Sequence, residues 1–327
     1  MKAVLCKAYG PPESLVVEEL PPLKAGLGEV VIDVRACGVN FPDVLIIQNK
    51  YQFQPPLPFA PGGEVAGVVK AVGEGVTGLR VGQRVIGSTG WGGFAEELAL
   101  DATRVTPIPD AMDFETASAF LLTYGTSHHA LKDRAQLQPG ETLLVLGAAG
   151  GVGLAAVELG KVMGARVIAA ASAPEKLAVC REHGADEVID YAKEDLKERV
   201  KKLTAGAGAD VVYDPVGGDF SEAALRATAW NGRFLVIGFA AGDIPKIPLN
   251  LVLLKGCAVV GVFWGAFTAR EPARNRANIE ELLAWFEAGK IRPHISATYP
   301  LEQAAVALND MAARRVTGKV VLVPQRR

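Results

Sequence analysis

A run of closely spaced glycines has the residue types and the spacing of a phosphate-binding turn. It reads Gly147-Ala148-Ala149-Gly150-Gly151-Val152-Gly153 and follows the apolar segment 143–146. Glycine allows backbone N–H groups to approach a pyrophosphate, and a helix beginning here directs the positive end of its dipole at that anion. The pattern predicts a dinucleotide site with these contacts: Ala149, Gly150, Gly151, Val152 and Gly153. The alternative is a turn that only permits close packing of a strand on a helix.

The segment after the next predicted strand bears on which dinucleotide binds. NAD-binding proteins usually carry an acidic side chain there, about twenty residues after the glycines, which binds the ribose 2′-hydroxyl. Here residues 170–173 read Ala-Ala-Ser-Ala, and the first acidic residue is Glu175. Ser172 and Lys176 instead suit a 2′-phosphate, because an uncharged tip removes repulsion and a lysine adds a counter-charge. These residues favour NADPH over NADH, while Lys176 alone is also typical of a solvated helix surface.

Strand-like and helix-like segments alternate around these residues. Apolar runs predict six strands, at residues 143–146, 166–171, 187–191, 210–214, 234–237 and 257–263. Helices are predicted at residues 152–163, 174–183, 194–203 and 221–229. Repeated strand–helix units with apolar strands are typical of a parallel sheet covered on both faces. We therefore predict an α/β fold in which residues 125–264 form a doubly wound, Rossmann-type domain.

The rest of the chain predicts a second, β-rich domain. Short strand-like segments separated by Gly and Pro indicate a small barrel or sandwich, at residues 29–35, 64–72 and 83–86. Asp113 can cap a helix within residues 114–131. The C-terminal part predicts helices at residues 274–288 and 301–314 and a strand at 319–323. We expect these to complete the first domain, so that residues 1–124 and 265–327 form one discontinuous unit.

Composition excludes several function classes. The 327 residues suggest about two domains, and 34 Lys+Arg against 36 Asp+Glu give a net charge of −2. Without a basic excess, neither nucleic acid nor a membrane surface is an expected partner. The four cysteines form no C-x-x-C pair and no disulfide framework. The N-terminus does not have the pattern of a signal peptide, so we expect a cytoplasmic protein with reduced thiols.

Four segments together resemble the zinc-free quinone oxidoreductases, the ζ-crystallin-like family of the medium-chain dehydrogenase/reductase superfamily. They are Ala-Cys-Gly-Val-Asn at 36–40, Pro-Gly-Gly-Glu-Val-Ala-Gly at 61–67, Ala-Ala-Gly-Gly-Val-Gly at 148–153 and Thr-Gly-Lys-Val-Val-Leu at 317–322. The resemblance covers nearly the whole chain. It implies a GroES-like fold for the β-rich domain and a substrate cleft between that domain and the Rossmann domain.

The resemblance also bears on metal binding. Zinc-dependent relatives have Cys at the position of Asn40 and His at the position of Gly63, and neither Asn nor Gly offers a ligand that zinc prefers. Their second, structural zinc needs four closely spaced cysteines, which this sequence lacks. Without a Lewis acid, alcohol oxidation is not expected, whereas quinones and enones remain accessible to hydride transfer. A short-chain dehydrogenase is not favoured either, because no Tyr is followed by Lys four residues later.

Further site residues follow from the resemblance alone. It implies that Asn40 lies near the nicotinamide and the substrate, Thr126 near the nicotinamide ribose, Tyr191 near the 2′-phosphate and Lys319 on the cofactor side. The remaining predicted cofactor contacts lie at the carboxyl ends of the last three strands: Val216, Phe239, Phe263 and Trp264. Structural interpretations stay open, because Asn40 also suits a turn and the aromatic side chains also suit a core.

Tyr51 is the candidate proton donor or substrate-orienting hydroxyl. It follows Asn40 by eleven residues and matches a cleft tyrosine in relatives. Some relatives have a second Tyr at the position of Leu45, so this pocket is expected to be more apolar. Tyr51 also suits a surface loop, and solvent can protonate a reduced quinone without any side-chain acid. The adjacent His128 and His129 are predicted to be structural.

Three functions remain open from the sequence. The first is an NADPH-dependent reductase of quinones or related α,β-unsaturated carbonyls. The second is an enoyl-thioester or other enone reductase for which quinone turnover is incidental, and the third is a non-catalytic NADPH-binding protein. The apolar segment 257–264 also predicts a homodimer formed by edge-to-edge strand pairing across a two-fold axis, unless that edge is covered within one chain.

Overall fold

The computed structural model describes residues 1–325 and separates into two compact units. The first unit comprises Met1–Leu122 together with the chain from Pro293 onward, and the second comprises Thr123–Arg292. The expected boundary after residue 264 differs from this division, because residues 265–292 belong to the second unit. The last two residues of the expected range 265–327 lie outside the described residues.

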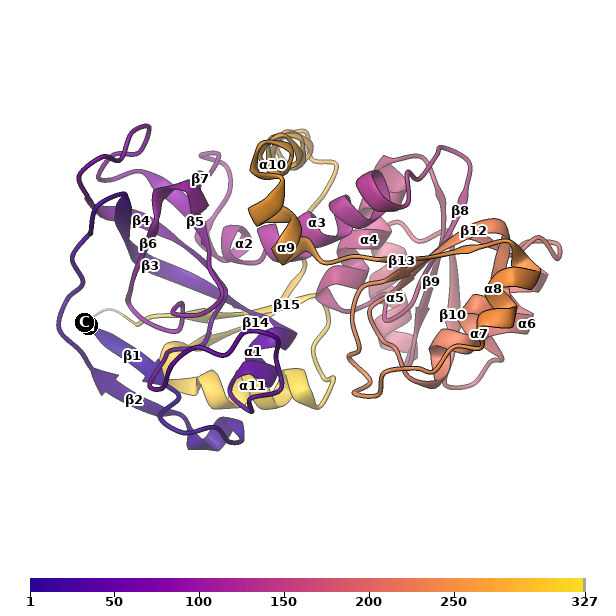
Figure 1. Cartoon of the computed structure of the whole chain (residues 1–327), viewed down its shortest axis with the longest axis horizontal. Helices are drawn as coiled ribbons and strands as arrows, with labels where there is room; N and C mark the ends of the chain where they lie inside the picture. The colour runs from indigo at the N-terminus through magenta and orange to yellow at the C-terminus, as the bar shows by residue number, and fades with distance from the viewer. Residues whose placement is uncertain (326–327) are drawn as a thin grey trace. The chain divides into compact units, whose positions relative to one another are not determined.

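The first unit is β-rich (Figure 1). Its larger sheet has the strand order β14-β15-β3-β4-β5-β7, with β6 also paired to β3, and β1 pairs with β2 separately. The strands are β1 (Lys2–Leu5), β2 (Val16–Glu19), β3 (Glu29–Val39), β4 (Glu64–Val72), β5 (Arg84–Ser88), β6 (Glu97–Asp101), β7 (Val105–Pro107), β14 (Ile295–Pro300) and β15 (Lys319–Val323). The helices are α1 (Phe41–Ile46), α2 (Phe114–Ser118) and α11 (Ala304–Ala312), with 3₁₀ turns at Pro12–Ser14, Ala102–Arg104 and Leu301–Gln303.

The C-terminal strand completes the first unit, as predicted. β15 pairs antiparallel with β3, so that Val321 lies opposite Gly38. β14, which the sequence analysis did not predict, extends the sheet by pairing parallel to β15. The Asp113 carboxylate caps α2 by accepting a hydrogen bond from the N–H of Thr116 at 2.7 Å, which confirms the predicted cap.

The second unit is a doubly wound α/β domain. Its parallel strands have the order β10-β9-β8-β11-β12-β13. From β8 the chain adds strands first on one side and then, from β11, on the other, and this change of side between β8 and β11 is typical of dinucleotide-binding folds. The strands are β8 (Thr142–Val145), β9 (Arg166–Ala171), β10 (Glu187–Asp190), β11 (Ala209–Asp214), β12 (Thr228–Val236) and β13 (Ala258–Gly261). The helices are α3 (Leu121–His128), which crosses the division at residue 122, the π-helical segment His129–Arg134, α4 (Gly151–Val162), α5 (Pro174–Glu182), α6 (Leu196–Leu203), α7 (Asp219–Ala227), α8 (Leu249–Lys255), α9 (Trp264–Arg270) and α10 (Pro272–Glu287).

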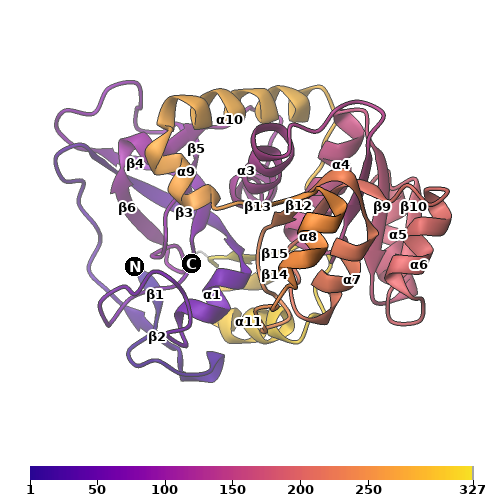
Figure 2. The same cartoon turned by 45° about the vertical axis from the view of Figure 1, so that its right-hand side comes forward.

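Alternating side chains divide this sheet into two faces. Leu144 and Val212 pack with apolar residues of α6, α7 and α8 in one core cluster, and Figure 2 shows α7 and α8 in front of the strands. Leu143 and Val167 point the opposite way and meet α4 at Gly160. A Cβ on Gly160 would lie 2.7 Å from Cδ2 of Leu143, so glycine permits the close approach of α4.

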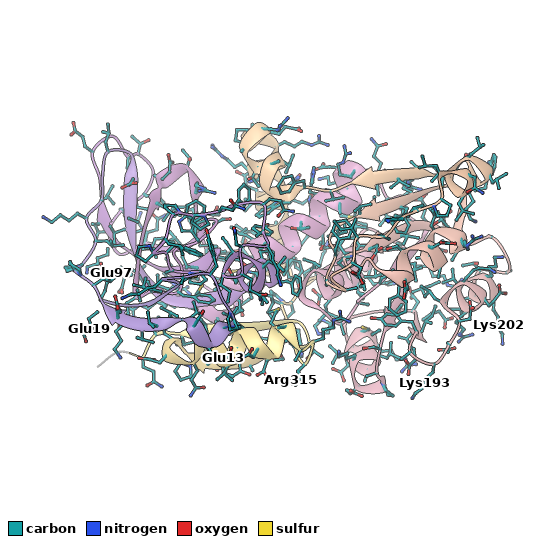
Figure 3. All side chains as sticks on the ribbon, turned by 60° about the horizontal axis from the view of Figure 1, so that its bottom comes forward. Glu13, Glu19, Glu97, Lys193, Lys202 and Arg315 are labelled. Atoms are coloured by element: carbon teal, nitrogen blue, oxygen red, sulfur yellow. The ribbon has the colours of Figure 1, made fainter. Side chains whose placement is uncertain are left out.

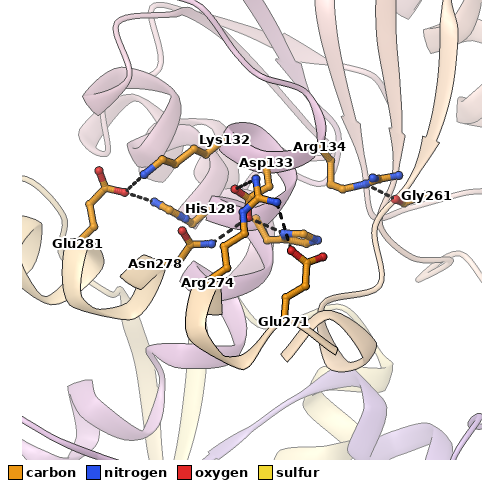
Figure 4. Close-up of polar contacts among 10 residues, drawn as sticks. His128, Lys132, Asp133, Arg134, Gly261, Glu271, Arg274, Asn278 and Glu281 are labelled. Atoms are coloured by element: carbon orange, nitrogen blue, oxygen red, sulfur yellow. Dashed lines mark hydrogen bonds and ion pairs between the residues drawn. The ribbon is translucent and has the colours of Figure 1, made fainter. Parts of the chain in front are cut away.

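Asp133 explains why α10 belongs to the second unit (Figure 4). Its carboxylate is almost fully buried in the π-helical segment. His129 Nδ1 lies 2.7 Å from it, and Asn278 and Arg274 of α10 reach it at 2.9 and 2.8 Å. The His129 ring also stacks on Phe267 of α9, with ring centroids 3.8 Å apart. The helices α9 and α10 therefore both pack on the π-helical segment.

A second group of contacts repeats this attachment further along α10. Glu281 lies 2.7 Å from Nε2 of His128 and 2.5 Å from Nζ of Lys132 (Figure 4). Burial lowers the pKa of His128, although the Glu281 carboxylate opposes this effect. These contacts favour the predicted structural role of both histidines.

Lysine side chains of the second unit lie at the surface, whereas the cysteines are buried. Lys202 lies on α6, and Figure 3 shows the Lys193 and Lys202 side chains at the outside of the ribbon. All four cysteines are buried and free: Cys6, Cys37, Cys180 and Cys257. Within residues 1–325, no helix combines the length and the apolar character needed to span a bilayer.

Candidate functional site

The carboxyl ends of the six parallel strands align most of the predicted cofactor residues along one edge of the second sheet. In the order of the strands, this edge carries Tyr191, Ser172, the glycine turn 147–153, Val216, Phe239 and Phe263. Adjacent strands lie about 4.8 Å apart, so the row extends over roughly 24 Å from the first strand to the last. The fold therefore brings residues that are far apart in sequence to one edge, where ligands of doubly wound domains bind.

The glycine turn joins β8 to α4 in a conformation that side chains would obstruct. Gly147 is left-handed, with φ +55°. A Cβ on Gly153 would lie 2.3 Å from the carbonyl oxygen of Gly147, which no side chain could tolerate. Gly150 is the N-cap of α4 and has no side chain to accept the free N–H groups of the first turn. Bare donors at a helix N-terminus suit a pyrophosphate.

Ser172 and Tyr191 lie side by side at the ends of β9 and β10. These strands pair so that Asp190 lies opposite Ala171, and the N–H of Tyr191 bonds the carbonyl of Ala171 at 3.1 Å. Ser172 is exposed immediately after β9. Lys176 lies in the first turn of α5, which begins at Pro174. The structure thus groups a hydroxyl, a phenol and a cation at this end of the row.

Val216 and Phe239 come from two loops that are hydrogen bonded to each other. The N–H of Ala241 bonds the carbonyl of Val216 at 2.8 Å. Val216 lies directly against the glycine turn, because a Cβ on Gly147 would come within 2.8 Å of its Cγ2. Phe239 lies against Gly217, where an added Cβ would be 2.9 Å from the Phe239 ring. The two loops therefore form one wall beside the turn.

Trp264 lies against α3, the helix that carries Thr126. A Cβ on Gly125 would be 2.7 Å from the Trp264 ring, so glycine makes room for the indole. Trp264 begins α9 rather than ending a strand, because β13 stops at Gly261. Phe263 is 51% exposed, and Thr126 is half-buried.

Asn40 and Lys319 are in direct contact in the first unit. Both residues are buried, with 4% of their surface exposed. The Lys319 ammonium donates to Oδ1 of Asn40 at 2.5 Å and to the carbonyl of Val39 at 2.9 Å. Nδ2 of Asn40 donates to the carbonyl of Gly38 at 3.2 Å. These bonds fix the orientation of the amide, since a lysine can only donate.

Two carboxyl groups that sequence reasoning did not single out share this buried place. Asp43 accepts hydrogen bonds from the N–H groups of Asn40 at 2.8 Å and Gly62 at 3.1 Å. Burial raises its pKa to about 6, although these bonds and the charge of Lys319 oppose the change. Glu64 accepts from the N–H of Leu122 at 3.0 Å. Burial raises the pKa of Glu64 to about 7, and Lys319 again opposes this most strongly.

Burial shifts the pKa of Lys319 in the opposite direction. Its pKa is lowered because the buried ammonium loses hydration, and the carboxyl groups of Glu64 and Asp43 partly offset this loss. The sequence signals this buried charged cluster only through Glu64 and Lys319, the charged first residues of the apolar strands β4 and β15. Burial itself depends on neighbours that are distant in sequence.

Tyr51 is half-buried against the core of the first unit rather than fully exposed in a loop. Its ring makes an edge-on contact with Phe53, with centroids 5.7 Å apart. Burial raises the pKa of Tyr51, and the nearby Asp43 carboxylate adds to this effect. The phenol therefore stays protonated at neutral pH and can donate a hydrogen bond.

Gly63, where zinc-dependent relatives have His, has little room for a side chain. A Cβ there would lie 3.2 Å from the carbonyl oxygen of Thr89 and 3.8 Å from that of Gly90. In the part of the chain that the structure describes, no three His, Cys, Asp or Glu side chains are grouped closely enough to hold a metal ion.

Comparisons with known proteins agree with this architecture. Residues 26–110 match the family described as "Alcohol dehydrogenase GroES-like domain", and residues 151–287 match "Zinc-binding dehydrogenase". The chain is 44% identical over 325 residues to a quinone oxidoreductase-like protein 2 homolog of Nematostella vectensis, covering 98% of this chain and 88% of the relative. It is 39% identical over 324 residues to a quinone oxidoreductase of Pseudomonas aeruginosa, covering 99% of each.

A solved structure extends the similarity to the whole fold. The Escherichia coli quinone oxidoreductase, determined in complex with NADPH, has a TM-score of 0.93 to this chain, with 29% identity over 99% of this chain and 100% of that one. The GroES-like and Rossmann folds predicted for the two parts are thereby confirmed. The chain belongs to the zinc-free quinone oxidoreductase family of the medium-chain dehydrogenase/reductase superfamily.

Proposed function

We propose that the protein is an NADPH-dependent, zinc-independent reductase that transfers a hydride to quinones or related α,β-unsaturated carbonyl compounds. The observation that carries this proposal is the bare glycine turn at the start of α4, with Ser172 at the end of the neighbouring strand and Lys176 in the helix that follows. The names of the similar proteins add support, because a quinone oxidoreductase with 29% identity was solved with NADPH.

Each group of residues has a separate task in this reaction. The first-turn N–H groups of α4 bind the pyrophosphate, and Ser172 and Lys176 bind the 2′-phosphate. When bound, NADPH supplies the hydride, while the protein supplies position and a dry surrounding. Asn40 orients the reacting groups through its amide, which Lys319 holds. A quinone that accepts a hydride becomes a hydroquinone anion, which takes its proton from solvent or from the Tyr51 phenol.

Zinc independence is proposed on the local geometry around residues 40 and 63. Asn40 offers an amide in place of a thiolate, and its hydrogen bonds to Lys319 and to the carbonyl of Gly38 hold that amide in one orientation. Gly63 lies where a larger side chain would press on the carbonyl of Thr89. Turnover is therefore expected to persist in the presence of a strong chelator.

The first experiment follows NADPH absorbance with small quinones and enones, beside NADH, for the wild type and Lys176→Ala. Loss of one charge-assisted bond should raise the KM for NADPH about tenfold and leave the KM for NADH unchanged. Lys202→Ala, which removes a lysine of α6 in the same unit, is the matched control and should change neither value.

The outcomes separate the three functions. Turnover of quinones with NADPH, resistant to a chelator, supports the proposal. Turnover of enones alone indicates an enone or enoyl-thioester reductase instead. Tight NADPH binding without turnover of any acceptor indicates a non-catalytic protein, and alcohol oxidation abolished by the chelator contradicts zinc independence.

We also propose that two copies associate through β13 and that the protein is cytoplasmic. β13 is the last strand of its sheet, and Val259 on it is 43% exposed. Leu249 and Leu253 of α8, each 79% exposed, add apolar surface in the same unit. An edge strand with an exposed apolar side chain is suited to pairing with a second copy. The buried free thiols support a reducing compartment.

A further inference from the structure

The last two residues of β11 carry buried polar side chains at the centre of the second sheet. Tyr213 is fully buried and Asp214 is 3% exposed. Because side chains alternate along a strand, they point to opposite faces. Strands of such sheets are usually apolar, and a buried polar group is costly unless it is hydrogen bonded. The partners of these two side chains therefore indicate what they stabilise.

Tyr213 connects α3 to the first turn of α4. Its hydroxyl lies 2.8 Å from Oγ of Ser127, and that Oγ donates to the carbonyl of Val152 at 2.8 Å. Since the single hydrogen of the serine hydroxyl goes to Val152, the tyrosine must be the donor in the other bond. The Tyr213 carbonyl also accepts the N–H of Leu146 at 3.0 Å, immediately before the glycine turn.

Asp214 holds the loop of Val216, which lies against the glycine turn. Its Oδ1 accepts the N–H groups of Val216 at 2.8 Å and Gly217 at 2.9 Å. Its Oδ2 accepts the hydroxyl of Ser221 in α7 at 2.5 Å. The carbonyl of Asp214 also accepts the N–H of Ile237 at 3.0 Å, in the segment leading to Phe239. One residue thus fixes both loops beside the glycine turn.

We propose that Tyr213 and Asp214 are positioning residues that hold the cofactor-binding segments of the second unit at the separation a dinucleotide requires. Tyr213 sets the distance of α3, with Thr126, from the start of α4, and Asp214 sets the place of Val216. This inference rests on the proposed function. It adds two residues, neither of which contacts the cofactor itself, to the set that determines affinity.

The effect should be the same for both nicotinamide dinucleotides. The segments that Tyr213 and Asp214 hold lie beside the glycine turn, which is proposed to bind the pyrophosphate. NADPH and NADH both contain this pyrophosphate. The groups that distinguish the two cofactors, Ser172 and Lys176, lie beyond β8 at the end of β9 and in α5. Loss of the Tyr213 hydroxyl should therefore weaken the binding of NADPH and of NADH by the same factor, whereas Lys176→Ala should weaken the binding of NADPH alone.

The test measures equilibrium binding of NADPH and NADH by fluorescence for Tyr213→Phe, Ser127→Ala and the double variant. Each single variant should weaken binding of both cofactors about three- to tenfold, as expected for one hydrogen bond. The double variant should bind no more weakly than the weaker single variant, because both changes break one connection. Asp214→Asn should weaken both cofactors by a similar factor, and kcat should stay within about twofold of wild type.

Tyr124→Phe is the matched control. It removes a tyrosine hydroxyl of similar burial, which bonds Glu158 near the far end of α4 at 2.6 Å. It should lower the thermal unfolding temperature without changing either dissociation constant by more than about twofold. Ser127→Ala removes the other partner of the same hydrogen bond and provides the same test if Tyr213→Phe does not fold.

Three results would overturn the proposal. It requires the folded single variants to bind both cofactors more weakly than wild type, so unchanged dissociation constants contradict it. Equal weakening by Tyr124→Phe would mean that general destabilisation, rather than positioning, lowers affinity. A wild-type protein that binds neither cofactor would remove the proposed function together with this inference, whereas normal wild-type binding with unaffected variants removes this inference alone.

Discussion

Asp43 and Glu64 are carboxyl groups enclosed where water does not reach, beside the buried ammonium of Lys319. In the folded protein burial raises their pKa values to about 6 and about 7, whereas the unfolded chain returns them to about 3.8 and 4.5. Between those values the folded state binds more protons than the unfolded state. Their contribution to stability is therefore fully present below about pH 4 and is lost as the pH rises through 6 and 7.

Glu64→Gln should make stability less dependent on pH. Glutamine resembles the protonated carboxyl in shape and can still accept the bond from Leu122. Between about pH 5.5 and 8.0 the thermal unfolding temperature of wild type should fall more than that of the variant. The matched control is Glu222→Gln, an exposed residue paired with Arg226, which should keep the wild-type slope. An identical slope in Glu64→Gln would show that Glu64 does not titrate in this range.

Local spacing explains which residues could be predicted at this scale. The glycine turn is identifiable because each glycine has a local backbone reason, such as the left-handed Gly147 or the crowded Gly153. Asp43 and Glu64 are not identifiable, because nothing in their neighbouring sequence tells which charged residues the fold will bury.

At the scale of elements, the π-helical segment His129–Arg134 acts as the attachment point for α9 and α10. Asp133 bonds Asn278 of α10 directly and holds His129, which stacks on Phe267 of α9, and the side chains of His129 and Asn278 are nearly buried. The Arg274 side chain is half exposed, so its ion pair with Asp133 adds less. Irregular helical turns of this kind often occur near functional sites. Here it holds the helix that begins at Trp264.

Asp133→Ala should destabilise the second unit by about 2–4 kcal/mol, because it leaves buried polar partners without an acceptor. Circular dichroism during thermal unfolding measures the loss, and hydrogen exchange should show the earliest opening in α10. Glu187→Ala, which removes an exposed ion pair with Arg166, is the control and should cost less than about 1 kcal/mol. Equal losses in both variants would mean that the Asp133 contacts do not stabilise α10.

Strands with nearly continuous runs of small and apolar residues are predicted closely, as β4, β9 and β15 show. β14 is missed although Ile-Ser-Ala-Thr-Tyr-Pro alternates between apolar and polar residues, because the segment is short and its parallel pairing with β15 depends on contacts distant in sequence. α10 is predicted as a helix but assigned to the wrong unit. Its amphipathic pattern shows that it packs, whereas the partner is decided by the contacts of Asp133 and Glu281.

At the scale of the whole molecule, an exposed strand edge and apolar helix side chains make the second unit suited to self-association. Val259→Lys places a charge on β13, which opposes edge pairing. Light scattering at micromolar concentration should give a dimer for wild type and a monomer for this variant. Val306→Lys on α11 of the first unit, where the side chain is 48% exposed, is the matched control and should stay dimeric. A monomeric wild type contradicts the proposed association.

The pairing of β15 with β3 has a consequence for the order in which the chain acquires its functional parts during synthesis. Every strand of the second unit has been synthesised by Gly261, before β14 and β15 are made, so the sheet of that unit can form before the sheet of the first unit is complete. Synthesis of the first unit begins earlier, but its sheet is completed later, because β3 pairs with β15, which lies nearly three hundred residues downstream. Lys319, which orients Asn40, arrives with that partner. The nascent protein therefore gains the parts of its proposed dinucleotide site first and its oriented Asn40 last.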